Sequence, residues 1–132
     1  MRETEESAVG FSGIDDMAIS IQGRSREFSF TNKKSGWFYG EINAPAQSGW
    51  HGWFINAQKI LRDYEVAVDG NPLRRDSTVL SEVFPDRLLR RYANGILETF
   101  LLPDHIDALL IQLDFSDNQV HQIAILPLFD SP

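Results

Sequence analysis

Apolar and polar residues alternate with a period of two along much of the chain, which is the pattern of β-strands with one buried face. The alternation covers residues 17–22 and 27–31, and residues 23–26 between them begin with a glycine. We therefore expect these two runs to pair as a hairpin. The strongest alternation covers residues 63–69 and ends in a turn at Asp69-Gly70, where glycine adopts a positive φ without steric cost.

Three later segments also predict strands. Residues 109–115 and 120–126 alternate on either side of a polar turn, which predicts a second hairpin. Residues 96–102 are apolar on both faces except for two positions and end at Pro103, as in a strand that is covered on two sides.

One stretch is ambiguous at the level of the sequence. In residues 77–92, Leu80 and Val83 fit a helical turn that begins after an Asp76 or Ser77 cap. Pro85 would end any such helix, because proline lacks a backbone N–H.

Short strands separated by Gly and Asx turns predict an all-β fold, an antiparallel β-sandwich. We expect residues 1–13 to form a flexible polar segment and residues 14–132 to form the sandwich domain. Residues 123–129 stay apolar almost to the last residue, whereas natural C-termini are usually polar and loosely held. We therefore expect a partial sandwich, cut at its C-terminal end from a longer protein.

Composition narrows the class of protein. The 132 residues include 19 acidic and 12 basic side chains, a net charge of −7, and no cysteine. A disulfide framework, a thiolate nucleophile and a cysteine-based zinc site are therefore excluded. The acidic balance argues against nucleic acid as a partner, because that affinity comes from clustered Lys and Arg. With neither a signal sequence nor an apolar stretch of about 20 residues, we expect a cytoplasmic protein with no membrane partner.

Charges are unevenly distributed. Residues 92–132 contain six acids and neither Lys nor Arg, whereas five arginines lie in residues 74–91. We interpret these groups as solvated positions that pair across the sandwich. The alternative, an anion-binding patch, lacks the aromatic residues that such sites interleave with arginine.

Few residues suggest catalysis. The three histidines are too scattered for a metal-ligand motif, so no cofactor is expected. Glycoside hydrolysis needs two carboxylates about 5 to 9 Å apart. The close pairs in the sequence are Asp15 with Asp16, Asp63 with Glu65, Asp104 with Asp107, and Asp114 with Asp117. Each lies at a turn or on a polar strand face, so we interpret all of them as solvated.

All three tryptophans lie within residues 37–53, in two short aromatic segments. Aromatic rings of this size commonly form a core or a domain interface, and this is the interpretation that we favour. The alternative is a surface platform that stacks on the apolar faces of sugars. The candidate residues for either role are Trp37, Tyr39, Trp50, His51 and Trp53.

The order of these motifs resembles the N-terminal domain of bacterial glycogen debranching enzymes of the amylo-α-1,6-glucosidase type. It is carried by residues 36–40, residues 50–55 with their His-Gly step, residues 63–73 with their Val-Asp-Gly turn, and a closing Pro-Leu step at residues 127–128. The family implies a supersandwich-like module that precedes an (α/α)6 toroid, in which the catalytic acid and base lie. The resemblance therefore implies a non-catalytic domain that packs on a downstream catalytic domain and contacts α-glucan.

Two other functions are compatible with the residues. The chain could be a free-standing carbohydrate-binding module that uses Trp50, Trp53 and Tyr39. It could also be a small hydrolase that uses a carboxylate pair, which predicts turnover of aryl glucosides by these residues alone.

Overall fold

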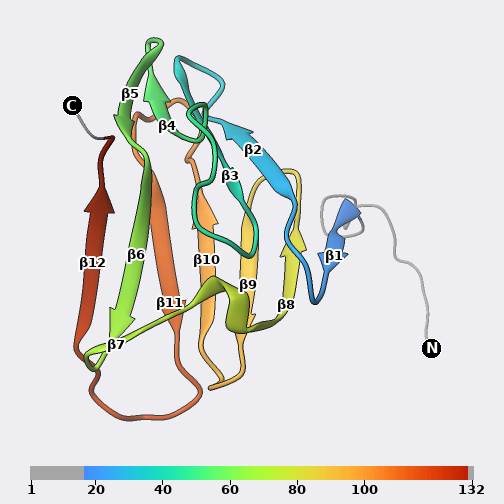
Figure 1. Cartoon of the computed structure of the whole chain (residues 1–132), viewed down its shortest axis with the longest axis vertical. Helices are drawn as coiled ribbons and strands as arrows, with labels where there is room; N and C mark the ends of the chain where they lie inside the picture. The colour runs from blue at the N-terminus through green and yellow to red at the C-terminus, as the bar shows by residue number, and fades with distance from the viewer. Residues whose placement is uncertain (1–16, 131–132) are drawn as a thin grey trace.

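The computed structural model describes residues 17–130 (Figure 1). The predicted flexible segment, residues 1–13, and the pair Asp15 and Asp16 lie outside the described residues. The described part is all-β, with strands β1 to β12 and the short 3-10 turn η3.

The first layer is a five-stranded antiparallel sheet with the order β1-β8-β9-β10-β11. Its strands are β1 (Ile19–Ile21), β8 (Thr78–Val83), β9 (Leu88–Tyr92), β10 (Leu97–Leu101) and β11 (Leu110–Asp114).

The second layer consists of two smaller sheets. One has the order β2-β3-β4-β5, with β2 (Glu27–Thr31), β3 (Gly36–Glu41), β4 (Gly52–Ile55) and β5 (Gln58–Leu61). The other has the order β12-β6-β7, with β12 (Ile123–Leu128), β6 (Asp63–Val68) and β7 (Asn71–Pro72). Only Arg62 separates β5 from β6, and Figure 1 shows the chain passing directly from one to the other.

Aromatic side chains join the two layers. The Phe100 ring of β10 lies 4.8 Å from Phe38 of β3 and 5.7 Å from Tyr64 of β6, measured between ring centroids. Phe28 of β2 also meets this ring edge-on. The core therefore lies between the layers, and the predicted antiparallel β-sandwich is confirmed.

Both predicted hairpins are wrong, although their strands exist. β1 pairs with β8 and not with β2, because residues 23–26 carry the chain from the first layer to the second. Likewise β11 pairs with β10, and β12 pairs with β6. Period-two alternation determines which face of a strand is buried, but it does not determine the neighbouring strand.

The ambiguous stretch forms strands. Residues 75–77 make the 3-10 turn η3, and β8 and β9 then pair as a hairpin. Leu80 and Val83 therefore lie on a strand, and the helical alternative is wrong. Pro85 lies in the connection between the two strands, where its missing N–H costs no ladder hydrogen bond.

Candidate functional site

The outer face of β2 and β3 carries polar and aromatic side chains. Glu27 lies opposite Glu41, and Ser29 lies opposite Tyr39. Alternate residues of both strands, such as Phe28 and Phe38, point into the core. The sequence alternation thus separates a buried aromatic face from an outer face that remains available for contacts.

The aromatic residues of the outer face differ in what covers them. Trp37 of β3 stacks on Phe54 of β4, with the ring centroids 5.2 Å apart and the planes 10° from parallel. The Lys59 ammonium lies 5.6 Å from the Phe54 ring centroid. Tyr39, in contrast, is 43% exposed and lies opposite Gly52. Its ring therefore meets no side chain from the opposite position of β4.

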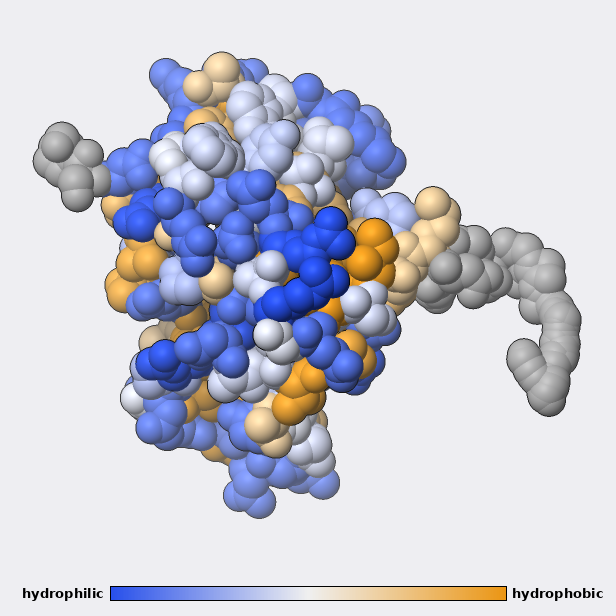
Figure 2. Space-filling view, turned by 45° about the vertical axis from the view of Figure 1, so that its right-hand side comes forward, coloured by the Kyte–Doolittle hydropathy of each residue, from blue (hydrophilic) through white to orange (hydrophobic). Residues whose placement is uncertain are grey.

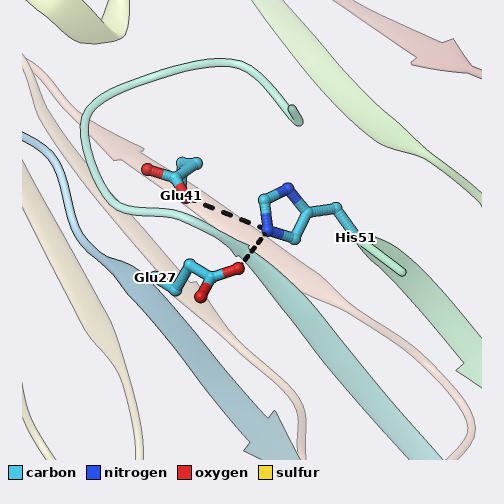
Figure 3. Close-up of side chains that lie close together, drawn as sticks. All are labelled: Glu27, Glu41 and His51. Atoms are coloured by element: carbon cyan, nitrogen blue, oxygen red, sulfur yellow. Dashed lines mark hydrogen bonds and ion pairs between the residues drawn. The ribbon is translucent and has the colours of Figure 1, made fainter. Parts of the chain in front are cut away.

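His51 is held beneath the loop that precedes β4. Its side chain is fully buried, and its Nδ1 accepts hydrogen bonds from the backbone N–H groups of Gln47 and Ser48, at 3.0 and 3.3 Å. Because a backbone N–H can only donate, the ring proton lies on Nε2. That atom donates to Glu27 Oε2 over 2.7 Å (Figure 3).

Glu27 receives a second hydrogen bond, from the indole Nε1 of Trp50 at 3.1 Å. The hydrogen bond from His51, followed by the one from Trp50, lowers the pKa of the Glu27 carboxyl. The Trp50 side chain is thereby fixed at the surface, where the residue is 62% exposed. Glu41 lies beside them, 3.8 Å from His51 Nε2, and accepts a hydrogen bond from Ser25 Oγ at 2.8 Å.

Glu27, Glu41 and His51 place three potential metal ligands within 4.8 Å of one another. A histidine that binds a metal through Nε2 normally donates its other N–H to a carboxylate or carbonyl. Here Nδ1 accepts from two backbone donors, so it holds no proton to donate. The hydrogen bonding therefore fits a histidine that positions a carboxylate and does not fit a metal ligand.

The structure brings together four of the five predicted site residues. Trp37, Tyr39, Trp50 and His51 all lie on or above the outer face of the β2-β3-β4-β5 sheet. Trp53 does not, because it pairs with the inward-facing Phe38 and packs against the core. The aromatic cluster is thus divided between the core and the surface.

Sequence reasoning missed the two carboxylates that complete the outer face. Glu27 occupies an outward position of an alternating strand, which the pattern alone could have indicated. Its approach to His51 spans 24 residues and depends on the loop, so the sequence held no signal for it.

A second group of ionisable side chains lies buried between the layers. Arg90 and Glu98 are each 1% exposed, with 3.3 Å between Nη1 and Oε1. The hydroxyls of Tyr64 and Tyr92 donate to the Glu98 carboxylate over 2.6 and 2.8 Å. Arg90 also donates to the backbone carbonyls of Ile42 and Glu41. We call Arg90, Glu98, Tyr64 and Tyr92 the central cluster.

Burial and pairing act against each other in this cluster. Burial alone would raise the pKa of Glu98, but the Arg90 charge and the two tyrosine hydroxyls lower it. Burial, reinforced by the Glu98 charge, raises the pKa of both tyrosines. The carboxylate therefore stays ionised and each hydroxyl keeps its proton.

Arg90 and Glu98 were both interpreted from the sequence as solvated charges, and this interpretation is wrong because both are buried. Asp63, also interpreted as solvated, is 4% exposed and forms a bidentate pair with Arg75, with two distances of 2.9 Å. The other arginine pairs, such as Arg74 with Asp76, do lie at the surface, as expected.

A cavity of about 340 Å³ opens beside the central cluster. Its polar wall includes Glu98, Tyr92 and Arg75. The two buried arginines near this cavity, Arg90 and Arg75, are already paired with Glu98 and Asp63, respectively. This pairing favours a structural role for the cluster, and the outer face is the better candidate for binding.

Comparisons with known proteins add no relative to this picture. Within the described residues, no helix has the length and apolar character needed to cross a bilayer. No protein-family model matches the chain, and neither does any curated protein or solved structure.

Proposed function

We propose that this chain is a non-catalytic β-sandwich module that binds α-glucan through the outer face of β2 and β3. The observation that carries the proposal is the ordered carboxylate of Glu27, which accepts a hydrogen bond from the exposed Trp50 and lies on the same outer sheet face as the exposed Tyr39. We call these three residues the glucan face.

The chemistry of a sugar matches these groups. A glucose ring has apolar C–H faces that pack on aromatic rings, and hydroxyls around its edge that donate hydrogen bonds. Glu27 uses Oε2 for its bonds to His51 and Trp50, and its side chain is 52% exposed, so the carboxylate remains accessible to a sugar hydroxyl. A hydrogen bond to an ionised acceptor is stronger than a neutral one. Because His51 already orders Glu27, little side-chain entropy is lost on binding.

The proposal places catalysis outside these residues. A glycosidase needs one protonated carboxyl as a general acid, whereas the lowered pKa of Glu27 keeps it ionised at neutral pH. The resemblance to debranching enzymes supports a parent α-glucan hydrolase in which the module packs on a downstream (α/α)6 catalytic domain.

Titration with maltoheptaose tests the proposal. We expect calorimetric binding, with amide shifts in residues 27–41 and 48–52 of the ¹⁵N-labelled chain. Trp50→Ala and Tyr39→Ala should each weaken binding about tenfold or more, because each removes a stacking surface. Glu27→Gln should weaken it less, since the amide still accepts a hydrogen bond.

Phe129→Ala is the matched control, because Phe129 is 64% exposed but lies after β12. It should bind as the unchanged chain does. Unchanged amide spectra at millimolar maltoheptaose would refute the proposal, as would equal losses in Phe129→Ala and Trp50→Ala. Turnover of an aryl glucoside by this chain would instead favour the small-hydrolase alternative.

A further inference from the structure

The two layers of the sandwich end on the same side of the molecule. β11 is the terminal strand of the first layer and β12 is the terminal strand of the second. Figure 1 shows both toward its left side. We call β11 together with residues 123–129 the open edge.

The open edge is apolar and poorly covered. Ile123, Ile125 and Leu126 are 46%, 46% and 54% exposed, and Leu110 of β11 is 48% exposed. Ile125 lies opposite the buried Val66, so it faces the inside of the sandwich and is still half exposed. β12 therefore exposes apolar side chains on both of its faces. On the face in Figure 2, by contrast, apolar residues form separate groups among hydrophilic ones.

Backbone hydrogen bonds show which groups of β12 face the free side. The carbonyl of Gln122 accepts from Asp69 N–H, and the carbonyl of Leu128 accepts from Arg62 N–H. Backbone groups of alternate residues point to the same side of a strand, so the even-numbered residues of β12 face β6. The N–H and C=O groups of Ile123 and Ile125 therefore point away from β6, where no strand of the described residues pairs with them.

Pro127 fits this arrangement. Like the other odd-numbered residues of β12, it directs its backbone nitrogen away from β6, so its missing N–H costs no hydrogen bond to β6. Proline on that side also ends any strand that would pair there. The unpaired stretch that can accept another strand is consequently short, covering residues 123–126.

Charge indicates what such a strand would carry. Acidic side chains lie on the strands at this edge, with Glu65 opposite Leu126 and Asp114 at the end of β11. Asp117 is paired with His121, and Asp130 is paired with Lys59. Residues 92–130 contain neither Lys nor Arg. A second copy would bring the same acids to this place and be repelled, whereas a basic partner would be attracted.

We propose that the open edge binds an extended apolar segment of a partner protein, flanked by Lys or Arg, which adds a strand to β12. The backbone of residues 123–126 supplies the hydrogen bonds, and the exposed isoleucines supply the apolar contacts. This inference rests on β11 and β12 and is independent of glucan binding.

A synthetic peptide of alternating valine and threonine, with two lysines at each end, tests the inference in trans. We expect amide shifts of the ¹⁵N-labelled chain confined to residues 110–114 and 123–129. The same peptide with glutamates in place of lysines should bind at least tenfold more weakly. Raising the salt concentration should weaken the lysine peptide, because screening removes the charge attraction.

Two variants at one position separate backbone pairing from apolar contact. Ile125→Pro removes the free-side N–H without removing a bond to β6, and it should abolish peptide binding. Ile125→Ala retains the N–H and should weaken binding only a few-fold. Equal binding by both variants would refute strand addition, as would the absence of shifts with the lysine peptide. If the chain sediments as a dimer without peptide and the amide signals of residues 123–126 broaden, the edge binds a second copy of this chain and the proposal of a basic partner is refuted.

Discussion

The central cluster and the glucan face use similar groups in opposite ways. In both, a carboxylate accepts two strong hydrogen bonds, from Tyr64 and Tyr92 at Glu98 and from His51 and Trp50 at Glu27. Glu98, however, is 1% exposed, whereas the Glu27 side chain is 52% exposed. The same ordering produces a structural anchor in one case and an accessible acceptor in the other.

The two carboxylates differ in the charge and the exposed oxygen surface that remain for a further partner. Arg90 neutralises Glu98, and both side chains are buried between the layers. Glu27 has a neutral histidine as its partner, because Nδ1 of His51 accepts backbone hydrogen bonds. It therefore keeps a negative charge that faces water. Lowered pKa values occur at both carboxylates, so exposure and not pKa distinguishes the proposed binding site from the buried cluster.

The largest expected effect is the loss of the central charge pair. Glu98→Gln leaves the Arg90 charge buried without an opposite charge, which typically costs about 3–5 kcal/mol of unfolding free energy. Urea unfolding followed by tryptophan fluorescence measures it. Glu82→Gln, which breaks the more exposed pair with Arg91, should cost less than about 1 kcal/mol. Similar losses in the two variants would show that the central cluster is not the anchor.

A smaller loss is expected at the glucan face. His51→Ala leaves the amides of Gln47 and Ser48 and the Glu27 carboxylate without their partner, at a cost of about 1–3 kcal/mol. Amide exchange at Gln47 and Ser48 should accelerate, and maltoheptaose affinity should fall because Glu27 is no longer ordered. Ser29→Ala, on the same outer face, should change stability by no more than about 0.5 kcal/mol. If amide hydrogen exchange at Gln47 and Ser48 is unchanged in His51→Ala, His51 does not order this loop.

The smallest effect is expected at a third carboxylate group, around His121. Its Nδ1 lies 2.7 Å from Asp69 and its Nε2 lies 2.8 Å from Asp117, and the ring stacks on Phe115. The hydrogen bonds to Asp69 and then to Asp117 raise the pKa of His121. Its stabilising contribution is therefore complete below the ordinary pKa of about 6.5 and is lost as the pH rises through the raised value.

Thermal unfolding and an NMR titration of the His121 ring measure this effect. The melting temperature should decline above about pH 6.5 in the unchanged chain and less in His121→Gln. Asp117→Asn should lower the pKa of His121. If the pKa of His121 in the unchanged chain is at or below the ordinary value, the exposed carboxylates do not stabilise the imidazolium.

The sequence pattern predicted the strands better than their partners. Residues 27–31, 63–69 and 96–102 correspond closely to β2, β6 and β10. The turn at Asp69-Gly70 also agrees, with φ values of +52° and +81°. Both predicted hairpins failed, because local alternation reports burial and not pairing.

The candidate site shows the same limit. The aromatic segments indicated Trp37, Tyr39 and Trp50, which lie at the outer face. They also indicated Trp53, whose side chain instead packs against the core. Glu27 and Glu41 escaped notice because they lie far from His51 in the sequence. Arg90 and Glu98 were interpreted as solvated, since nothing local to a strand indicates that a charge will find its partner in the core.

By itself the sequence determined the class of fold, because a period of two permits little besides strands with one buried face. It also excluded cysteine chemistry. Only the tertiary structure decided which carboxylates are enclosed and which face water, and where the two layers leave strands unpaired. Those properties depend on contacts between residues far apart in the chain, and the free energy that stabilises them arises only when the two layers meet.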